Sequence, residues 1–124
     1  MAKDFDPDPG PPSHLQSELY RLALELTAKV FTVVELAEVE RYYLRDALDK
    51  KVTVIPVLIS RAEATVEVPE RRELFRRARK VTADCAAILD ILTMRGTVEP
   101  EVLGPARTVA AALIYKLDPL LVRW

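Results

Sequence analysis

The chain has 124 residues, 50% of them apolar, which is enough for one domain with one sizeable core and too little for two. Its formal net charge is −1, so the overall charge gives no support to nucleic-acid binding, and any such binding must come from a local basic patch. Glycine occurs only three times, while Ala, Leu, Glu and Arg are abundant, a balance that favours an all-α fold.

The beginning of the chain differs in composition from the rest. Residues 1–12, "MAKDFDPDPGPP", are acidic and rich in proline and glycine, with almost nothing to bury, so we expect a disordered arm. Ser13, followed three residues later by Gln16, forms a capping-box pattern that predicts the start of a helix. We therefore expect the folded domain to span residues 13–119.

The first expected helix carries apolar residues at steps of three and four and runs to about residue 34 or 37. These residues are Leu15, Leu19, Leu22, Leu26, Val30 and Val33. A second apolar line, Tyr20, Leu24 and Phe31, lies on nearly the opposite side of the helix. A helix with two apolar faces has two surfaces to cover, so we expect the second line to contact another copy of the chain.

The segment 40–64, "ERYYLRDALDKKVTVIPVLISRAEA", contains a β-branched stretch that suggests a strand, but we favour a helix. Its apolar residues keep a helical repeat, Pro56 would remove a ladder donor from a central strand, and no second strand is available for pairing. The repeat consists of Leu44, Leu48, Val52, Ile55, Ile59 and Ala62. Pro56 should kink the helix. Val54 and Val57 lie off the core line and join the expected oligomer contact.

Two further helices complete the expected fold. The third starts at Pro69, carries a heptad-like apolar line, and ends at Gly96, which suits a left-handed C-cap and leaves Thr97 to cap the next helix. That line is Leu74, Ala78, Val81, Cys85, Ile88 and Leu92. The fourth helix should stop near Asp118 and has the apolar line Val102, Ala106, Val109, Leu113 and Leu117. Four amphipathic helices with short links predict an antiparallel up-down four-helix bundle.

The end of the chain, residues 120–124, reads "LLVRW" and forms a short apolar tail. Leu120, Leu121 and Trp124 are poor residues to expose to solvent. They either contact another copy of the chain or pack back on their own bundle.

No catalytic constellation is present in the sequence. The only histidine, His14, lies beside the expected arm, and the single Cys85 lies on the core line of the third helix. We therefore expect no enzyme activity, no cofactor, no metal and no small-molecule substrate. One cysteine excludes an internal disulfide, and no signal peptide or apolar run of about 18 residues occurs, so we expect a cytoplasmic protein without a membrane partner.

The middle of the chain resembles a family of small four-helix bundles encoded in intervening sequences of bacterial 23S rRNA genes. This family is related to the accessory variability proteins of diversity-generating retroelements. The matching elements are "ERYYLRDAL", "VIPVLISRA", "LFRRARK" followed by "ADCAAILDIL", and "AAALIYKL", within residues 15–118. Leu58 stands where the intervening-sequence members usually have an asparagine, and we do not choose between the two branches.

The resemblance implies a non-enzymatic homo-oligomer, typically a five-membered ring. For the retroelement branch it also implies a basic surface that engages RNA and a reverse transcriptase. Such a ring would repeat each small surface patch once per copy, and a weak local field could then become a continuous basic surface.

The stretch "RRELFRRARK" is the basic surface that this chain offers. Residues 70–80 hold six basic residues against two acids, a local charge of +4. On a helical wheel Arg72, Arg76 and Arg79 share a side away from the core line. We expect Arg77 to pair with Glu73, and Lys80 with Asp84, at a spacing of four residues. The expected contribution of the preceding helix is Arg45, Lys50 and Lys51.

Two functional hypotheses follow from this stretch. In the first, the protein is an oligomeric adaptor that binds RNA, a reverse-transcriptase-type partner, or both, through these cations. In the second, it is a self-assembling scaffold without a nucleic-acid role, and the basic stretch is only a solvated helix face. Salt-sensitive nucleic-acid binding would distinguish the two.

Overall fold

The structure, a computed structural model, describes residues 17–37 and 42–122 of the chain. These residues form four α-helices and a short 3₁₀ helix, with no strand among them, so the all-α prediction is confirmed. The elements are α1 (Glu18–Leu36), α2 (Tyr42–Ala64), α3 (Val68–Arg95), α4 (Pro100–Leu117) and η2 (Asp118–Leu121). The expected arm of residues 1–12, His14 and Trp124 lie outside the described residues.

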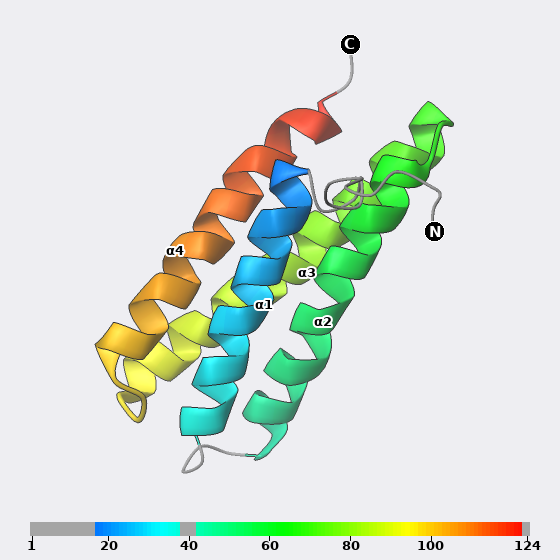
Figure 1. Cartoon of the computed structure of the whole chain (residues 1–124). Helices are drawn as coiled ribbons and strands as arrows, with labels where there is room; N and C mark the ends of the chain where they lie inside the picture. The colour runs from blue at the N-terminus through cyan, green and yellow to red at the C-terminus, as the bar shows by residue number, and fades with distance from the viewer. Residues whose placement is uncertain (1–16, 38–41, 123–124) are drawn as a thin grey trace, which may run out of the picture.

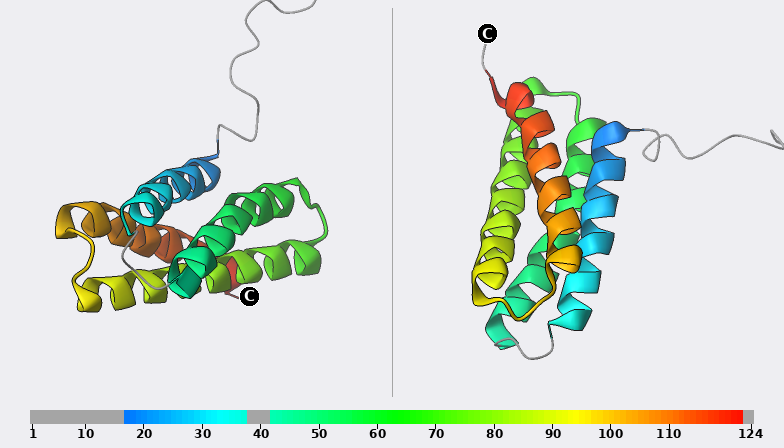
Figure 2. Two further views of the ribbon diagram at one scale, coloured as in Figure 1. Left: turned by 90° about the horizontal axis from the view of Figure 1, so that it is seen from below. Right: turned by 90° about the vertical axis from the view of Figure 1, so that its left-hand side faces the viewer.

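Each helix packs against two neighbours. Helices α2 and α4 both contact α1 on one side and α3 on the other. Figures 1 and 2 show the four helices side by side. Buried apolar residues of all four helices form one core. The starts of α1 and α3 lie at the upper end of Figure 1, together with the ends of α2 and α4.

The N-cap of α1 is Ser17, and the predicted capping pair Ser13 and Gln16 lies outside the described residues. The Ser17 hydroxyl accepts a hydrogen bond from the backbone N–H of Tyr20 at 3.1 Å, and it donates one to Glu63 of α2 at 2.6 Å. The bond from Tyr20 satisfies a backbone N–H of the first helical turn, so Ser17 is the N-cap and the helix begins at Glu18. The sequence pattern did not show Glu63, because it belongs to another helix.

Helix α2 runs without interruption through Pro56, and the strand alternative for this segment is therefore wrong. All six residues of its predicted apolar line are buried. They pack into the same core as Leu26, Val30 and Val33 of α1, which are also fully buried. Burial of this continuous apolar stripe outweighs the strand propensity of its valines and isoleucines.

The buried face of α3 differs from the predicted line. Leu74 and Val81 are only half-buried, whereas Phe75, Thr82 and Leu89 are buried. Helix α3 packs against both α2 and α4, so its buried sector is wider than the narrow seam of a heptad repeat. The buried Thr82 hydroxyl donates to the carbonyl oxygen of Ala78 at 2.7 Å, which satisfies its hydrogen-bonding need.

The helix ends agree with the predicted glycine signal but not with the predicted threonine cap. Gly96 has a φ of 72°, and its N–H donates to the carbonyl oxygen of Leu92 at 3.1 Å, so the left-handed C-cap is confirmed. The N-cap of α4 is Glu99, not Thr97. Helix α4 ends at Leu117, beside the predicted stop at Asp118, and η2 follows directly.

Candidate partner-binding surface

The first half of α3 carries the basic stretch, and its cations differ in whether they have acidic partners. Arg72, Arg77 and Lys80 make no ion pair within the described part of the chain. The Arg71 guanidinium lies 5.7 Å from the centre of the Phe75 ring, a cation–π distance. Arg72 is half-buried, while Arg77 and Lys80 are exposed.

Two of the three arginines predicted to be unpaired are neutralised. Arg76 forms an ion pair with Glu73, and Nε of Arg79 donates to Oδ1 of Asp118 at 2.7 Å. The predicted pair of Arg77 with Glu73 is therefore wrong, because Arg76, three residues after Glu73, takes that carboxylate. Of the three, only Arg72 makes no ion pair with another described residue.

The predicted pair of Lys80 with Asp84 is also wrong. Asp84 instead accepts from Nζ of Lys51 on α2 at 3.4 Å, an interaction that crosses the α2–α3 seam. Lys50 pairs with Asp46 on its own helix at 3.1 Å. Neither lysine therefore adds an unneutralised charge to the stretch on α3.

Arg45 lies away from the other predicted cations. Its side chain is half-buried, and its Nε has no hydrogen-bond partner in the part of the chain that the structure describes. It lines a small pocket of about 170 Å³ with Val34 of α1 and with Asp46 and Asp49 of its own helix. Arg45 therefore borders the α1–α2 seam, whereas Lys51 borders the α2–α3 seam.

A pocket lined by apolar and basic side chains lies at the start of α3, and the sequence pattern did not predict it. It has a volume of about 230 Å³ and is lined by Val68, Arg71, Arg72, Phe75 and Leu120. Leu120 comes from η2, which the end of α4 brings against α3. The apolar tail was the only sequence feature that pointed to such packing.

The residues predicted to contact another copy fall on two separate seams. Tyr20 is half-buried and packs against the protein's own core, but Leu24 and Phe31 are 37% and 41% exposed. Phe31 lies one turn before Val34, which faces α2, so this patch borders the α1–α2 seam.

On α2, Val54 and Val57 are 41% and 55% exposed. Val54 follows Lys51 by one turn, and this second patch therefore borders the α2–α3 seam.

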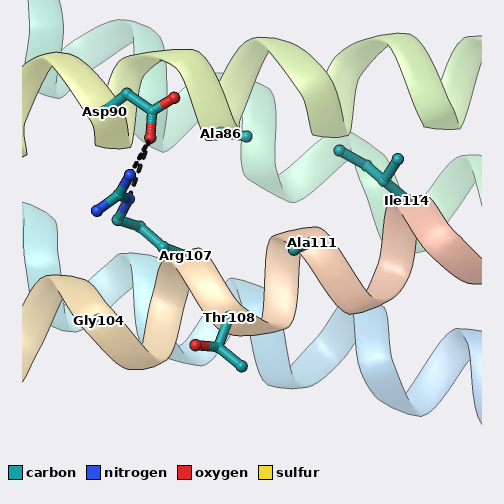
Figure 3. Close-up of a pocket in the computed structure, with 7 residues that line it drawn as sticks. All are labelled: Ala86, Asp90, Gly104, Arg107, Thr108, Ala111 and Ile114. Carbon is teal, nitrogen blue, oxygen red and sulfur yellow. Dashed lines mark hydrogen bonds and ion pairs between the residues drawn. The ribbon is translucent and has the colours of Figure 1, made fainter.

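A groove of about 500 Å³ lies between α3 and α4 (Figure 3). Arg107 of α4 donates to a single oxygen of Asp90 on α3, at 3.0 Å from Nε and 2.8 Å from Nη2. In Figure 3 the side chain of Thr108 points away from this ion pair. The rest of the lining is small or apolar: Ala86, Gly104, Ala111 and Ile114. The groove thus holds one neutralised pair and no nucleophile beside a base.

The single cysteine is an inert part of the core. Cys85 is fully buried, and burial raises the pKa of its thiol from 9.0 to about 12; the nearby Lys51 lowers this pKa and Asp84 raises it. A thiol with this pKa is protonated at neutral pH and is a poor nucleophile. Among residues 17–37 and 42–122 no group of three or more His, Cys, Asp or Glu side chains is placed to bind a metal ion.

Comparison with known proteins does not assign the chain to a family. No model of a known protein family matches the chain, and no curated protein is significantly similar to it. Within the described residues, no helix combines the length and the apolar character that a membrane span requires.

Proposed function

We propose that this chain is a non-enzymatic adaptor that binds RNA through the first half of α3. In this proposal the chain is an antiparallel up-down four-helix bundle that assembles into a ring and acts in the bacterial cytoplasm. The observation that supports this proposal most is the grouping of three cations in the first half of α3. Within residues 17–37 and 42–122, Arg72, Arg77 and Lys80 have no ion-pair partner, and they lie within about two turns of one helix, although the chain as a whole has a net charge of −1.

The chemistry of these three side chains suits a phosphate backbone. Arginine stays charged at all physiological pH values, and its planar fork donates two parallel hydrogen bonds to phosphate oxygens. Lysine adds a compact cation that attracts phosphate without a fixed geometry. Contacts of this kind position a nucleic acid without reading its bases, so binding should tolerate different sequences and weaken with salt.

The two exposed apolar patches support a ring. In a ring the interface is head-to-tail, so that one patch on each copy meets a different patch on the next. Leu24 and Phe31 on one seam and Val54 and Val57 on another supply two such patches. The preference for five copies, and for a reverse transcriptase as a second partner, comes from the family resemblance.

The test compares two triple variants of equal charge change. Arg72→Gln, Arg77→Gln and Lys80→Gln together should weaken binding of single-stranded RNA by roughly one to a few kcal/mol. The slope of log affinity against log salt should fall by about two, as expected for three lost contacts to a single strand. The control combines Lys50→Gln, Arg76→Gln and Arg107→Gln, which remove cations that are already paired.

The outcomes separate the proposal from its alternative. A larger loss of affinity in the first variant than in the control supports an RNA surface on α3. Unchanged binding by both variants, or no RNA binding by the wild type, means that the stretch is only solvated. The alternative, a self-assembling scaffold without a nucleic-acid role, is then the better account. It is favoured by the ion pairs that already neutralise Arg76, Arg79 and Lys51.

A further inference from the structure

The sequence before α1 contains a motif that the fold and the proposed function leave unused. Phe5 stands between two aspartates in "DFDPD", residues 4–8, and Lys3 is the only basic side chain in residues 1–12. This motif combines one large apolar side chain with flanking negative charge. It would suit a pocket lined by apolar and basic side chains.

The pocket at the start of α3 has this composition. Val68, Phe75 and Leu120 supply its apolar part, and the first and last of these are 59% and 39% exposed. Arg71 and Arg72 supply the basic part of its lining, and neither makes an ion pair within the described residues. The pocket therefore presents uncovered apolar area next to uncompensated positive charge, the complement of an aromatic residue between two acids.

The start of α1 lies at the end of the molecule that holds this pocket. Ser17 contacts Glu63 near the end of α2, and Glu18 pairs with Lys116 near the end of α4 at 3.3 Å. Helix α3 starts shortly after α2 ends, and η2 follows α4 directly, so both walls of the pocket belong to this end (Figure 1).

The arm is long enough to reach the pocket. Phe5 precedes Ser17 by 12 residues, which span up to ~40 Å when extended and ~37 Å as a polyproline II segment. Neighbouring helix axes lie ~10 Å apart in a bundle, so even the diagonal from α1 to α3 is well within this reach.

We propose that the arm folds back on its own bundle, with Phe5 in the pocket and Asp4 and Asp6 against Arg71 and Arg72. Attachment to the same chain gives the arm an effective concentration in the millimolar range, so a weak contact is enough for substantial occupancy. The docked arm neutralises Arg72. If α3 binds RNA, which rests on the proposed function, the docked arm competes with RNA for Arg72.

The experiment measures docking without any RNA, so that its result is independent of the proposed function. Ala2→Cys in the full-length protein is labelled with a nitroxide, and broadening of backbone amide signals is recorded by NMR. Cys85 is fully buried and should stay unlabelled, which the labelled wild type checks. Arg71, Phe75 and Leu120 should broaden, and Gly96 and Val98, where α3 ends and α4 approaches, should not.

Two variants and one matched control test the chemistry of the contact. Phe5→Ala with Asp4→Asn and Asp6→Asn should abolish the broadening, and so should Arg71→Gln with Arg72→Gln. The control Arg76→Gln with Arg77→Gln removes the same charge on the same helix outside the pocket lining and should leave the broadening intact.

Three results would overturn the proposal. The first is the absence of broadening around the pocket in the labelled protein. The second is broadening that persists in the arm variant. The third is equal broadening in a mixture of nitroxide-bearing unenriched protein and isotope-enriched unlabelled protein, because the pocket would then hold the arm of another copy.

Discussion

Nε of Arg79 donates a hydrogen bond to Oδ1 of Asp118 at 2.7 Å, which ties the middle of α3 to the first residue of η2. The two residues are 39 positions apart in sequence, and both side chains are partly exposed. This ion pair gives Arg79 a structural partner, and it holds η2, with Leu120, beside the start of α3.

Arg79→Gln and Asp118→Asn should each lower the free energy of unfolding by up to about 1 kcal/mol, because the pair is largely solvent-screened. Chemical denaturation of the two single variants and the double variant gives the coupling energy between the side chains. A coupling energy of zero would mean that the contact contributes nothing to stability. RNA affinity should change less in Arg79→Gln than in Arg72→Gln, which removes an unpaired cation.

Replacing an exposed apolar residue by a charge should break the proposed ring. Phe31→Glu and Val57→Glu lie in the two different patches, so either should give a monomer that keeps its helical circular dichroism. Light scattering at micromolar concentration measures the change. The control Thr32→Glu places the same charge on an exposed position outside both patches and should leave assembly intact. A monomeric wild type at that concentration would contradict the ring.

The two described glycines should respond to alanine in opposite directions. Gly96 has a φ of 72°, so Gly96→Ala should lower the free energy of unfolding by about 1–2 kcal/mol. Gly104 lies inside α4, where a Cβ atom would meet nothing within 4 Å, and Gly104→Ala should raise stability by roughly 0.5–1 kcal/mol. Thermal and urea unfolding test both. A stabilising Gly96→Ala would show that the C-cap is not strained.

The stability of the protein should fall at alkaline pH partly because of Cys85. Its folded-state pKa is raised to about 12 from an ordinary 9.0, so its contribution to stability is complete below pH 9 and is lost as the pH rises toward 12. The loss amounts to at most about 4 kcal/mol. Urea unfolding across this range should show a shallower decline for Cys85→Ala than for the wild type. Identical pH profiles would contradict the assignment, since lysines and tyrosines titrate in both proteins.

The positions of the helices could be read from sequence because they depend on local periodicity. The apolar line of α2 recurs every three or four residues over the whole segment, and this repeat correctly outweighed the strand propensity around Pro56. The C-cap at Gly96 could also be predicted from local sequence, because glycine adopts the left-handed φ after a helix without steric cost. The N-cap at Ser17 could not be read in this way, since it is selected in part by Glu63 of another helix.

Local sequence was enough to specify which segments are helical, because periodicity follows from the fixed geometry of one helix. The full buried face of α3 was not specified in this way, because it depends on packing against both α2 and α4. The neutralisation of individual charges also depends on packing. Asp84 could pair with Lys80 on its own helix, yet packing brings Lys51 within 3.4 Å, and Arg79 meets Asp118 only because η2 folds against α3. Such partners depend on how neighbouring helices are rotated and aligned, which no spacing within one helix specifies. The unpaired cations of α3, and with them the candidate surface, are therefore a property of the packed bundle.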